Sequence, residues 1–143
     1  MTRIETEIAI PGARERVWEV LTDFAAYPQW SPTILRISGD LDVGSRLAVR
    51  ILGPGGRAVT FRPKLVALEP GRLLRWDAVL LHPSVLSGLH QFWLDDDGTV
   101  GTRLVHSDTY SGVLTAPLRR LLAANEPLMR RQNMAIRGRT LNG

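Results

Sequence analysis

Four polar side chains have types and spacing that could support proton transfer: His90 on one predicted strand, and His106, Asp108 and Tyr110 on the next. Alternate residues of a strand share a face, so we predict that all four point inward. His106 and Asp108, two residues apart, lie about 7 Å from each other at Cα. A carboxylate beside a histidine can fix its tautomer and raise its pKa, which is half of a general acid/base arrangement. These four residues are the candidates for catalysis.

The same side chains also have structural interpretations. An unpaired half-buried histidine costs roughly 1–3 kcal/mol, so His90 and His106 are expected to hydrogen-bond to neighbours. Asp108 comes shortly before Ser111 and Gly112, where a turn or a helix start uses a carboxylate as an acceptor. Structural pairing, ligand contact and catalysis therefore stay open as alternatives for the histidines.

Strand alternation also places apolar residues on the inner face. These are Leu47, Val49, Ile51, Val59, Phe61, Leu65, Leu74, Trp76, Ala78, Leu80, Phe92, Leu94 and Leu104. An apolar wall with a few polar groups is typical of a site for a small molecule. The residues predicted to contact a ligand are Trp30, Phe61, Trp76, His90, Phe92, His106, Tyr110 and Asn133. For Trp76 and Phe92 a core position is the alternative, Trp30 would be a lid or a plug, and Asn133 would anchor the ligand by a hydrogen bond.

Other kinds of site find no support in the sequence. The chain has no cysteine, which excludes disulfides and thiolate nucleophiles. The acidic run 95–97 precedes Gly98 and is typical of a β-turn, and the three histidines lack the spacing of metal ligands. The glycine-rich segment 53–56 predicts a hairpin turn, because no helix follows it as in a phosphate-binding loop. We therefore expect neither a metal nor a cofactor.

Length and composition indicate one globular domain spanning residues 1–143, since 44% of residues are hydrophobic and 22% are charged. The net charge of +4 comes from arginines, concentrated in the last quarter of the chain, that lack accompanying aromatic residues. Such a pattern favours a solvated helix face over a nucleic-acid surface. No apolar signal core or membrane-length segment occurs, so we expect a cytoplasmic protein, either monomer or homodimer.

The elements that must position the inward side chains follow from periodicity. Residues 3–10 alternate as a strand, 13–22 show helical spacing, and the two prolines in 27–32 allow one turn of helix. Turn signals then recur at strand intervals from 34 to 111, which indicates an antiparallel meander. From 113 to 137 the period becomes helical, with a break expected near Glu126 before Pro127, and residues 138–143 are expected to fray.

Several stretches together resemble the SRPBCC superfamily, which includes START lipid-transfer domains, pollen-allergen-type proteins and polyketide cyclases/dehydrases. These stretches are 8–13, 17–23, 27–30, 70–76, 90–94 and 101–108, which read IAIPGA, VWEVLTD, YPQW, PGRLLRW, HQFWL and GTRLVHSD. The resemblance implies an α+β helix-grip fold, in which a curved antiparallel sheet of six to seven strands wraps around a long C-terminal helix. Two short helices would follow the first strand, and a cavity would separate the sheet from the long helix.

The resemblance leaves the activity open, because one fold hosts many functions. Binding or transport of a small hydrophobic molecule, such as a lipid, a polyketide or an aromatic metabolite, is the first hypothesis. The second is a cyclase or dehydratase that uses the histidine, tyrosine and aspartate side chains as acid/base groups. The third is a protein-interaction domain whose cavity is incidental.

Overall fold

The computed structural model describes residues 1–143, apart from the side chain of Pro54. Eight strands form two antiparallel sheets, one of five strands in the order β1-β8-β7-β6-β5 and one of three in the order β2-β3-β4. The large sheet consists of β1 (Thr2–Ile10), β5 (Lys64–Glu69), β6 (Leu73–Leu80), β7 (Leu86–Asp96) and β8 (Thr102–Ser111). The small sheet consists of β2 (Ile34–Ser38), β3 (Ala48–Leu52) and β4 (Ala58–Phe61).

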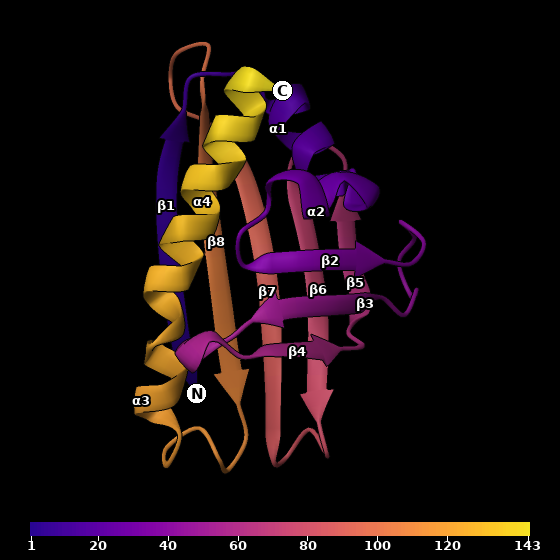
Figure 1. Ribbon diagram of the computed structural model, residues 1–143, viewed down its shortest axis with the longest axis vertical. Helices are drawn as coiled ribbons and strands as arrows, with labels where there is room; N and C mark the ends of the chain where they lie inside the picture. The colour runs from indigo at the N-terminus through magenta and orange to yellow at the C-terminus, as the bar shows by residue number, and fades with distance from the viewer.

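The helices are α1 (Arg14–Thr22), α2 (Tyr27–Trp30), α3 (Arg119–Ala123) and α4 (Asn125–Asn142), with short 3-10 turns at Phe24–Ala26 and Pro54–Gly56. Helix α4 lies along β1 and β8, whereas β2–β4 run crosswise over β5–β7 on the same face of the large sheet (Figure 1). Both layers therefore cover one face, and the core lies between them and the large sheet. No helix among the described residues is long and apolar enough to cross a membrane.

The helix-grip architecture is confirmed, but the prediction of one sheet with six to seven strands is wrong in its count. Strand β4 ends at Phe61, and the chain passes through the buried Pro63 into β5 of the other sheet. Proline has no N–H for a ladder, so it suits this crossing. The segments 44–47 and 63–65 still join the sheets at this edge, through bonds such as Leu47 N–H to the Pro63 carbonyl at 2.8 Å. Turn signals alone could not show which strands pair.

The C-terminal helix differs from the prediction at both ends. Residues 113–118 form turns, and the break falls at Ala124 rather than at Glu126. Pro127 therefore lies in the first turn of α4, where its missing N–H costs little. The expected fraying from residue 138 is also wrong, because α4 continues to Asn142 and Thr140 is buried. A Cβ atom added at Gly12 would lie only 3.1 Å from the Thr140 methyl group. The glycine therefore allows α4 to approach the end of β1 closely.

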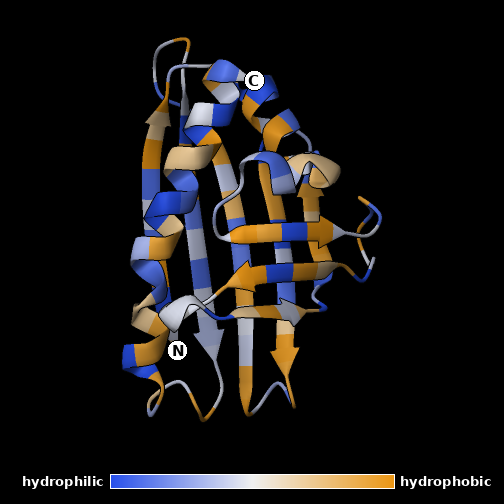
Figure 2. Cartoon of the chain, in the orientation of Figure 1, coloured by the Kyte–Doolittle hydropathy of each residue, from blue (hydrophilic) through white to orange (hydrophobic). Residues whose placement is uncertain are grey.

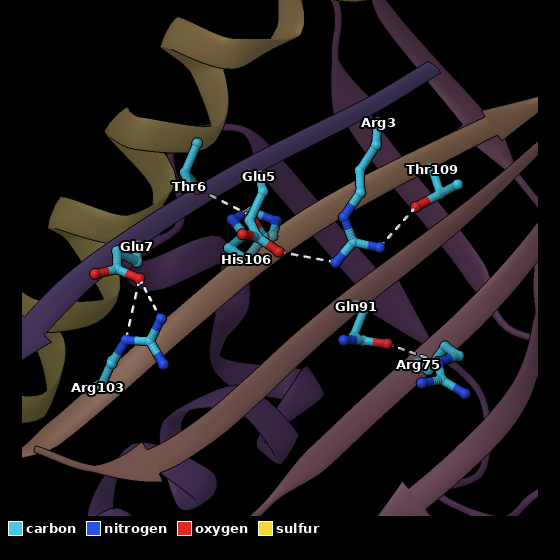
Figure 3. A network of polar contacts seen from close by, with 9 residues as sticks. All are labelled: Arg3, Glu5, Thr6, Glu7, Arg75, Gln91, Arg103, His106 and Thr109. Atoms are coloured by element: carbon cyan, nitrogen blue, oxygen red, sulfur yellow. Dashed lines mark hydrogen bonds and ion pairs between the residues drawn. The ribbon is translucent and has the colours of Figure 1, made fainter. Parts of the chain in front are cut away.

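Alternation along the long strands separates a charged outer face from an apolar inner face. On the outer face Arg103 contacts Glu7 at 2.6 Å and Arg75 donates to Gln91 at 2.8 Å (Figure 3). Inward residues of β6–β8 such as Leu74, Phe92 and Leu104 are fully buried. Hydrophobic residues predominate along the lower ends of β6 and β7 and in β2 and β3 (Figure 2). The predicted inner face is therefore present on the large sheet.

Candidate functional site

A cavity of about 200 Å³ lies between the large sheet, the small sheet and the C-terminal helices. Its wall is mostly aliphatic and aromatic. The lining residues are Thr33, Ile34, Val49, Ile51, Leu52, Phe61, Trp76, Ala78, Leu80, Leu86, Gly88, His90, His106, Asp108, Tyr110, Leu122, Asn125, Leu128 and Met129. The cavity thus has the composition of a site for a small hydrophobic molecule.

The polar side chains of the wall are concentrated on β7 and β8. In the register of these strands His90 lies directly opposite Asp108, and Phe92 lies opposite His106. Directly opposed residues of an antiparallel pair have Cβ atoms about 4.5–5.5 Å apart, so their side chains can meet. The His90 Nδ1 and Asp108 Oδ1 atoms are 2.5 Å apart, and the two side chains retain 16% and 14% exposure. Both side chains of this pair are therefore accessible from the cavity.

The prediction that Asp108 pairs with His106 is wrong. Residues two apart on one strand are about 7 Å apart at Cα, whereas the partner across the ladder is closer. Asp108 instead contacts His90, and its second oxygen accepts from the Tyr110 hydroxyl at 3.0 Å. The Asn125 amide donates in turn to the Tyr110 oxygen at 3.0 Å. A carboxylate that we expected to serve a turn thus belongs to a side-chain network on the cavity wall.

The second histidine is held from the opposite side, by α4 and β1. Thr6 donates its only hydroxyl proton to the His106 carbonyl at 3.0 Å, so its oxygen must accept from the Asn133 amide nitrogen, which is 2.8 Å away. The Asn133 carbonyl oxygen then faces His106 Nδ1 at 2.7 Å. A carbonyl oxygen can only accept, and therefore Nδ1 of His106 carries a proton. Figure 3 shows Thr6 beside His106, below the helix.

This assignment fixes the contact between the two histidines. Burial, followed by the nearby His90, lowers the pKa of His106 to about 3, so the ring is neutral at physiological pH. With its proton on Nδ1, His106 has a lone pair on Nε2, which lies 2.9 Å from His90 Nε2. His90 must therefore donate there. Asp108 does act to raise the pKa of His106, as expected, but burial and the nearby His90 outweigh it, so the net shift is downward.

His90 and Asp108 are close enough to share a proton, because the His90 Nδ1 and Asp108 Oδ1 atoms are 2.5 Å apart. Burial alone would raise the pKa of Asp108, but the neighbouring His90, through its charge and hydrogen bond, and the Tyr110 hydroxyl outweigh this and lower it. Burial, with the nearby Asp108 charge, raises the pKa of Tyr110, so its hydroxyl stays protonated. The lowered pKa keeps Asp108 a carboxylate, an acceptor that can take a proton from His90 Nδ1 and return it.

Aromatic rings hold both imidazoles in position. Trp76 lies parallel to His90, with 4.7 Å between ring centroids and 8° between planes. Phe92 stacks on His106 at 4.3 Å and 26°. Trp76 is 5% exposed and Phe92 is fully buried, so both rings pack within the protein interior. Packing and hydrogen bonding therefore both fix the two histidines.

The structure brings five of the eight residues predicted to contact a ligand into the cavity wall: Phe61, Trp76, His90, His106 and Tyr110. Phe92 and Asn133 lie behind His106 and position it instead. Trp30 packs on Tyr27 with 4.8 Å between ring centroids and lies outside the cavity lining. Val59, also predicted to point inward, is 43% exposed. It lies on β4, whose free edge faces solvent.

Sequence reasoning did not find Asn125 or Gln132. Asn125 is the first residue of α4, and it reaches the cavity because the helix breaks just before it. Gln132 is fully buried and accepts hydrogen bonds from Thr33 and Ile34 at the start of β2. The signal for Gln132 was its place on the helix face that also carries Met129 and Ile136, because a polar residue on a buried face needs partners.

Comparison with known proteins agrees with this architecture. The family described as "Polyketide cyclase / dehydrase and lipid transport" matches residues 1–139. No curated protein matches the chain in sequence. Among solved structures, the Zhui aromatase/cyclase from Streptomyces sp. R1128 is similar with a TM-score of 0.79 and 17% identity, over 98% of this chain and 93% of that one.

Two further solved structures share the fold. Norcoclaurine synthase from Thalictrum flavum gives a TM-score of 0.74 at 15% identity, over 98% of this chain and 94% of that one. Ara h 8.0201 gives 0.74 at 17% identity, over 99% of both chains. At such low sequence identity, the structural similarity shows a common fold alone. This fold fits the predicted resemblance to the SRPBCC superfamily. With the match over residues 1–139, the chain belongs to the polyketide cyclase/dehydrase and lipid transport family, which supports a ligand-binding or cyclase role.

Proposed function

We propose that the protein binds a small hydrophobic molecule in the cavity between its two sheets and α4. The observation that supports this is the composition of the wall, in which aliphatic and aromatic side chains surround polar groups that are bonded to one another. Among the described side chains, no buried nitrogen or oxygen lacks a hydrogen-bond partner. An apolar ligand can therefore enter the cavity without breaking the hydrogen bond of any buried polar side chain.

Burial of the ligand supplies the driving force. Each Å² of apolar surface removed from water contributes about 25 cal/mol, and the aromatic side chains Phe61 and Trp76 offer broad contact surfaces. The small volume favours a molecule of one to three rings or a short chain over a bulky lipid.

A neutral fluorescent probe, N-phenyl-1-naphthylamine, tests the proposal. We expect saturable binding of one probe per chain with enhanced emission. Ala78 lines the cavity and its neighbour Val79 is 44% exposed, so Ala78→Phe should weaken binding at least about 10-fold and Val79→Phe should leave it unchanged. Equal binding by both variants would show that the probe lies on the surface.

The second candidate function is cyclisation with loss of water, and the close contact of His90 with Asp108 on the cavity wall favours it. In an aldol cyclisation a base removes a proton from a carbon between two carbonyls, and the carbanion attacks a ketone in the same chain. The alkoxide then takes a proton, and the hydroxyl leaves as water with a second proton from carbon. A pair that both gives and accepts one proton suits these steps.

A linear poly-β-ketone thioester incubated with the protein tests this second candidate. Formation of a cyclic, dehydrated product detected by mass spectrometry would support it, provided that His90→Gln lowers the rate at least about 100-fold. His82→Gln is the matched control, since His82 is exposed and lies outside the cavity lining. Binding of the thioester without any change of mass would leave the ligand-binding proposal standing and remove the enzymatic one.

A further inference from the structure

Most of the hydrogen-bond donors on the polar side of the cavity are occupied. His106 donates from Nδ1 to Asn133, and His90 donates from Nε2 to His106. Tyr110 donates its hydroxyl proton to Asp108, and the Thr33 hydroxyl donates to Gln132 at 2.7 Å. A side chain that already donates its proton inside the protein has none left for a ligand.

These donors stay occupied whichever of His90 and Asp108 holds a proton between them. If it lies on His90, the ring donates to Asp108 from Nδ1. If it lies on Asp108, the carboxyl group donates to the same nitrogen. In both forms the proton stays between the two residues. Two donors of the side chains on the wall remain spare: the indole N–H of Trp76, and the second N–H of the Asn125 amide, which uses the other N–H on Tyr110.

Acceptors, by contrast, remain available. A carboxylate has about four acceptor positions, and Asp108 uses two of them, one for His90 and one for Tyr110. The Tyr110 oxygen accepts from Asn125 and retains a second lone pair. Asp108 keeps 14% of its side-chain surface exposed where it lines the cavity. None of the described residues that line the cavity is arginine or lysine, so an anionic ligand would find no free cation.

We propose that this cavity is selective for uncharged molecules that carry a hydroxyl or amino hydrogen-bond donor, held by Asp108 and Tyr110, and that it excludes carboxylates and phosphates. This inference rests on the proposed binding function and names the ligand class. A free fatty acid would bring its negative charge beside Asp108 without a compensating partner, which is costly in an apolar cavity. A phenolic or enolic compound would instead form a hydrogen bond to a charged acceptor, the stronger kind of such bond.

Three naphthalenes of similar size separate the possibilities, each competing with N-phenyl-1-naphthylamine on the wild-type protein. 2-Naphthol carries a donor, 2-methoxynaphthalene lacks it, and 2-naphthoate is an anion. We expect 2-naphthol to bind about 10-fold more tightly than the methyl ether, as a hydrogen bond to a charged group implies, and at least about 100-fold more tightly than the carboxylate. Equal affinity of naphthol and ether, or tighter binding of the carboxylate, would overturn the inference while the proposed function stands.

The variant Asp108→Asn supplies a second test, because an amide introduces N–H donors where the carboxylate has none. The preference for 2-naphthol over 2-naphthoate should fall at least about 10-fold in this variant. In Asp77→Asn, on the outer face of β6, the preference should remain that of the wild type. A preference unchanged in a folded Asp108→Asn protein would contradict the role of Asp108. Failure of the fluorescent probe to bind the wild type would overturn the proposed function and this inference together.

Discussion

Two consecutive amides on α4, Gln132 and Asn133, have the same chemistry and nearly the same burial but serve different parts of the molecule. Gln132 is 0% exposed and Asn133 is 2% exposed. The Gln132 carbonyl oxygen accepts from the Thr33 backbone and hydroxyl and from the Ile34 backbone, and its nitrogen donates to Ser31. Asn133 reaches the large sheet, where it contacts His106 and Thr6.

The difference shows that neighbouring residues of one helix can serve separate purposes, one for the stability of the fold and one for the protonation of a histidine in the site. Gln132 fastens α4 to the start of the small sheet through backbone groups that would otherwise be buried without partners. Asn133 determines which nitrogen of His106 carries a proton, and through it the direction of the bond from His90. Breaking the first contact should therefore loosen the fold, whereas breaking the second should change the site.

The largest effect is expected for Gln132→Leu. It removes four hydrogen bonds and leaves two buried backbone N–H groups unpaired, so we expect a loss of about 3–4 kcal/mol in the free energy of unfolding, measured by urea melts. Gln91→Leu is the matched control, because Gln91 bonds to Arg75 on the half-exposed outer face and should lose less than about 1 kcal/mol. Similar losses for both variants would refute the role of Gln132 as a clamp.

A smaller loss of stability, about 2 kcal/mol, is expected for Asn133→Leu, since it leaves the His106 Nδ1 proton without an acceptor. The decisive readout is imidazole nitrogen NMR. The wild type should show neutral His106 protonated on Nδ1, and the variant should lose that single tautomer. Asn142→Leu, on an exposed part of the same helix, should change neither quantity. A single Nδ1–H tautomer in the Asn133 variant would mean that something else fixes it.

The pH dependence of stability gives a more gradual effect. Because the pKa of His106 falls from its ordinary 6.5 to about 3 in the folded chain, the unfolded state binds the extra proton between these values. Stability should therefore decline as pH falls below 6.5, by up to about 1.4 kcal/mol per pH unit. Asp108, whose pKa is also lowered, adds a loss below its ordinary value of 3.8.

In His106→Gln the contribution of this histidine is absent, so the curve of stability against pH should be flatter between pH 6 and 4 than in the wild type. Urea melts at several pH values measure the difference. Parallel curves for the two proteins would contradict a neutral, buried His106 in the folded state.

Much of the fold follows from short-range patterns in the sequence. The alternation of Ile4, Thr6, Ile8 and Ile10 predicts the first strand, and the change of period after Gly112 predicts a C-terminal helical region. Periodicity also placed His90, His106 and Asp108 on one inner face. These are local properties, because the direction of a side chain depends on its position along its own strand.

The partners of these side chains depend on the pairing of strands, which no local pattern determines. Asp108 meets His90 because β7 and β8 pair in a register that aligns them, and a shift by one residue would have separated them. Likewise Asn133 was predicted to face a ligand, but the placement of α4 against β1 turns it toward Thr6 and His106. The set of site residues could thus be predicted in large part, whereas their connections could not.

Imidazole NMR during titration with 2-naphthol shows whether small uncharged molecules bind beside His90. The chain has three histidines: His90 and His106 line the cavity, and the exposed His82 lies outside its lining and serves as an internal control. We expect the His90 signals to shift and to saturate at one ligand per chain while those of His82 stay unchanged. A saturating shift confined to His82, or no shift at any histidine despite binding, would contradict this expectation.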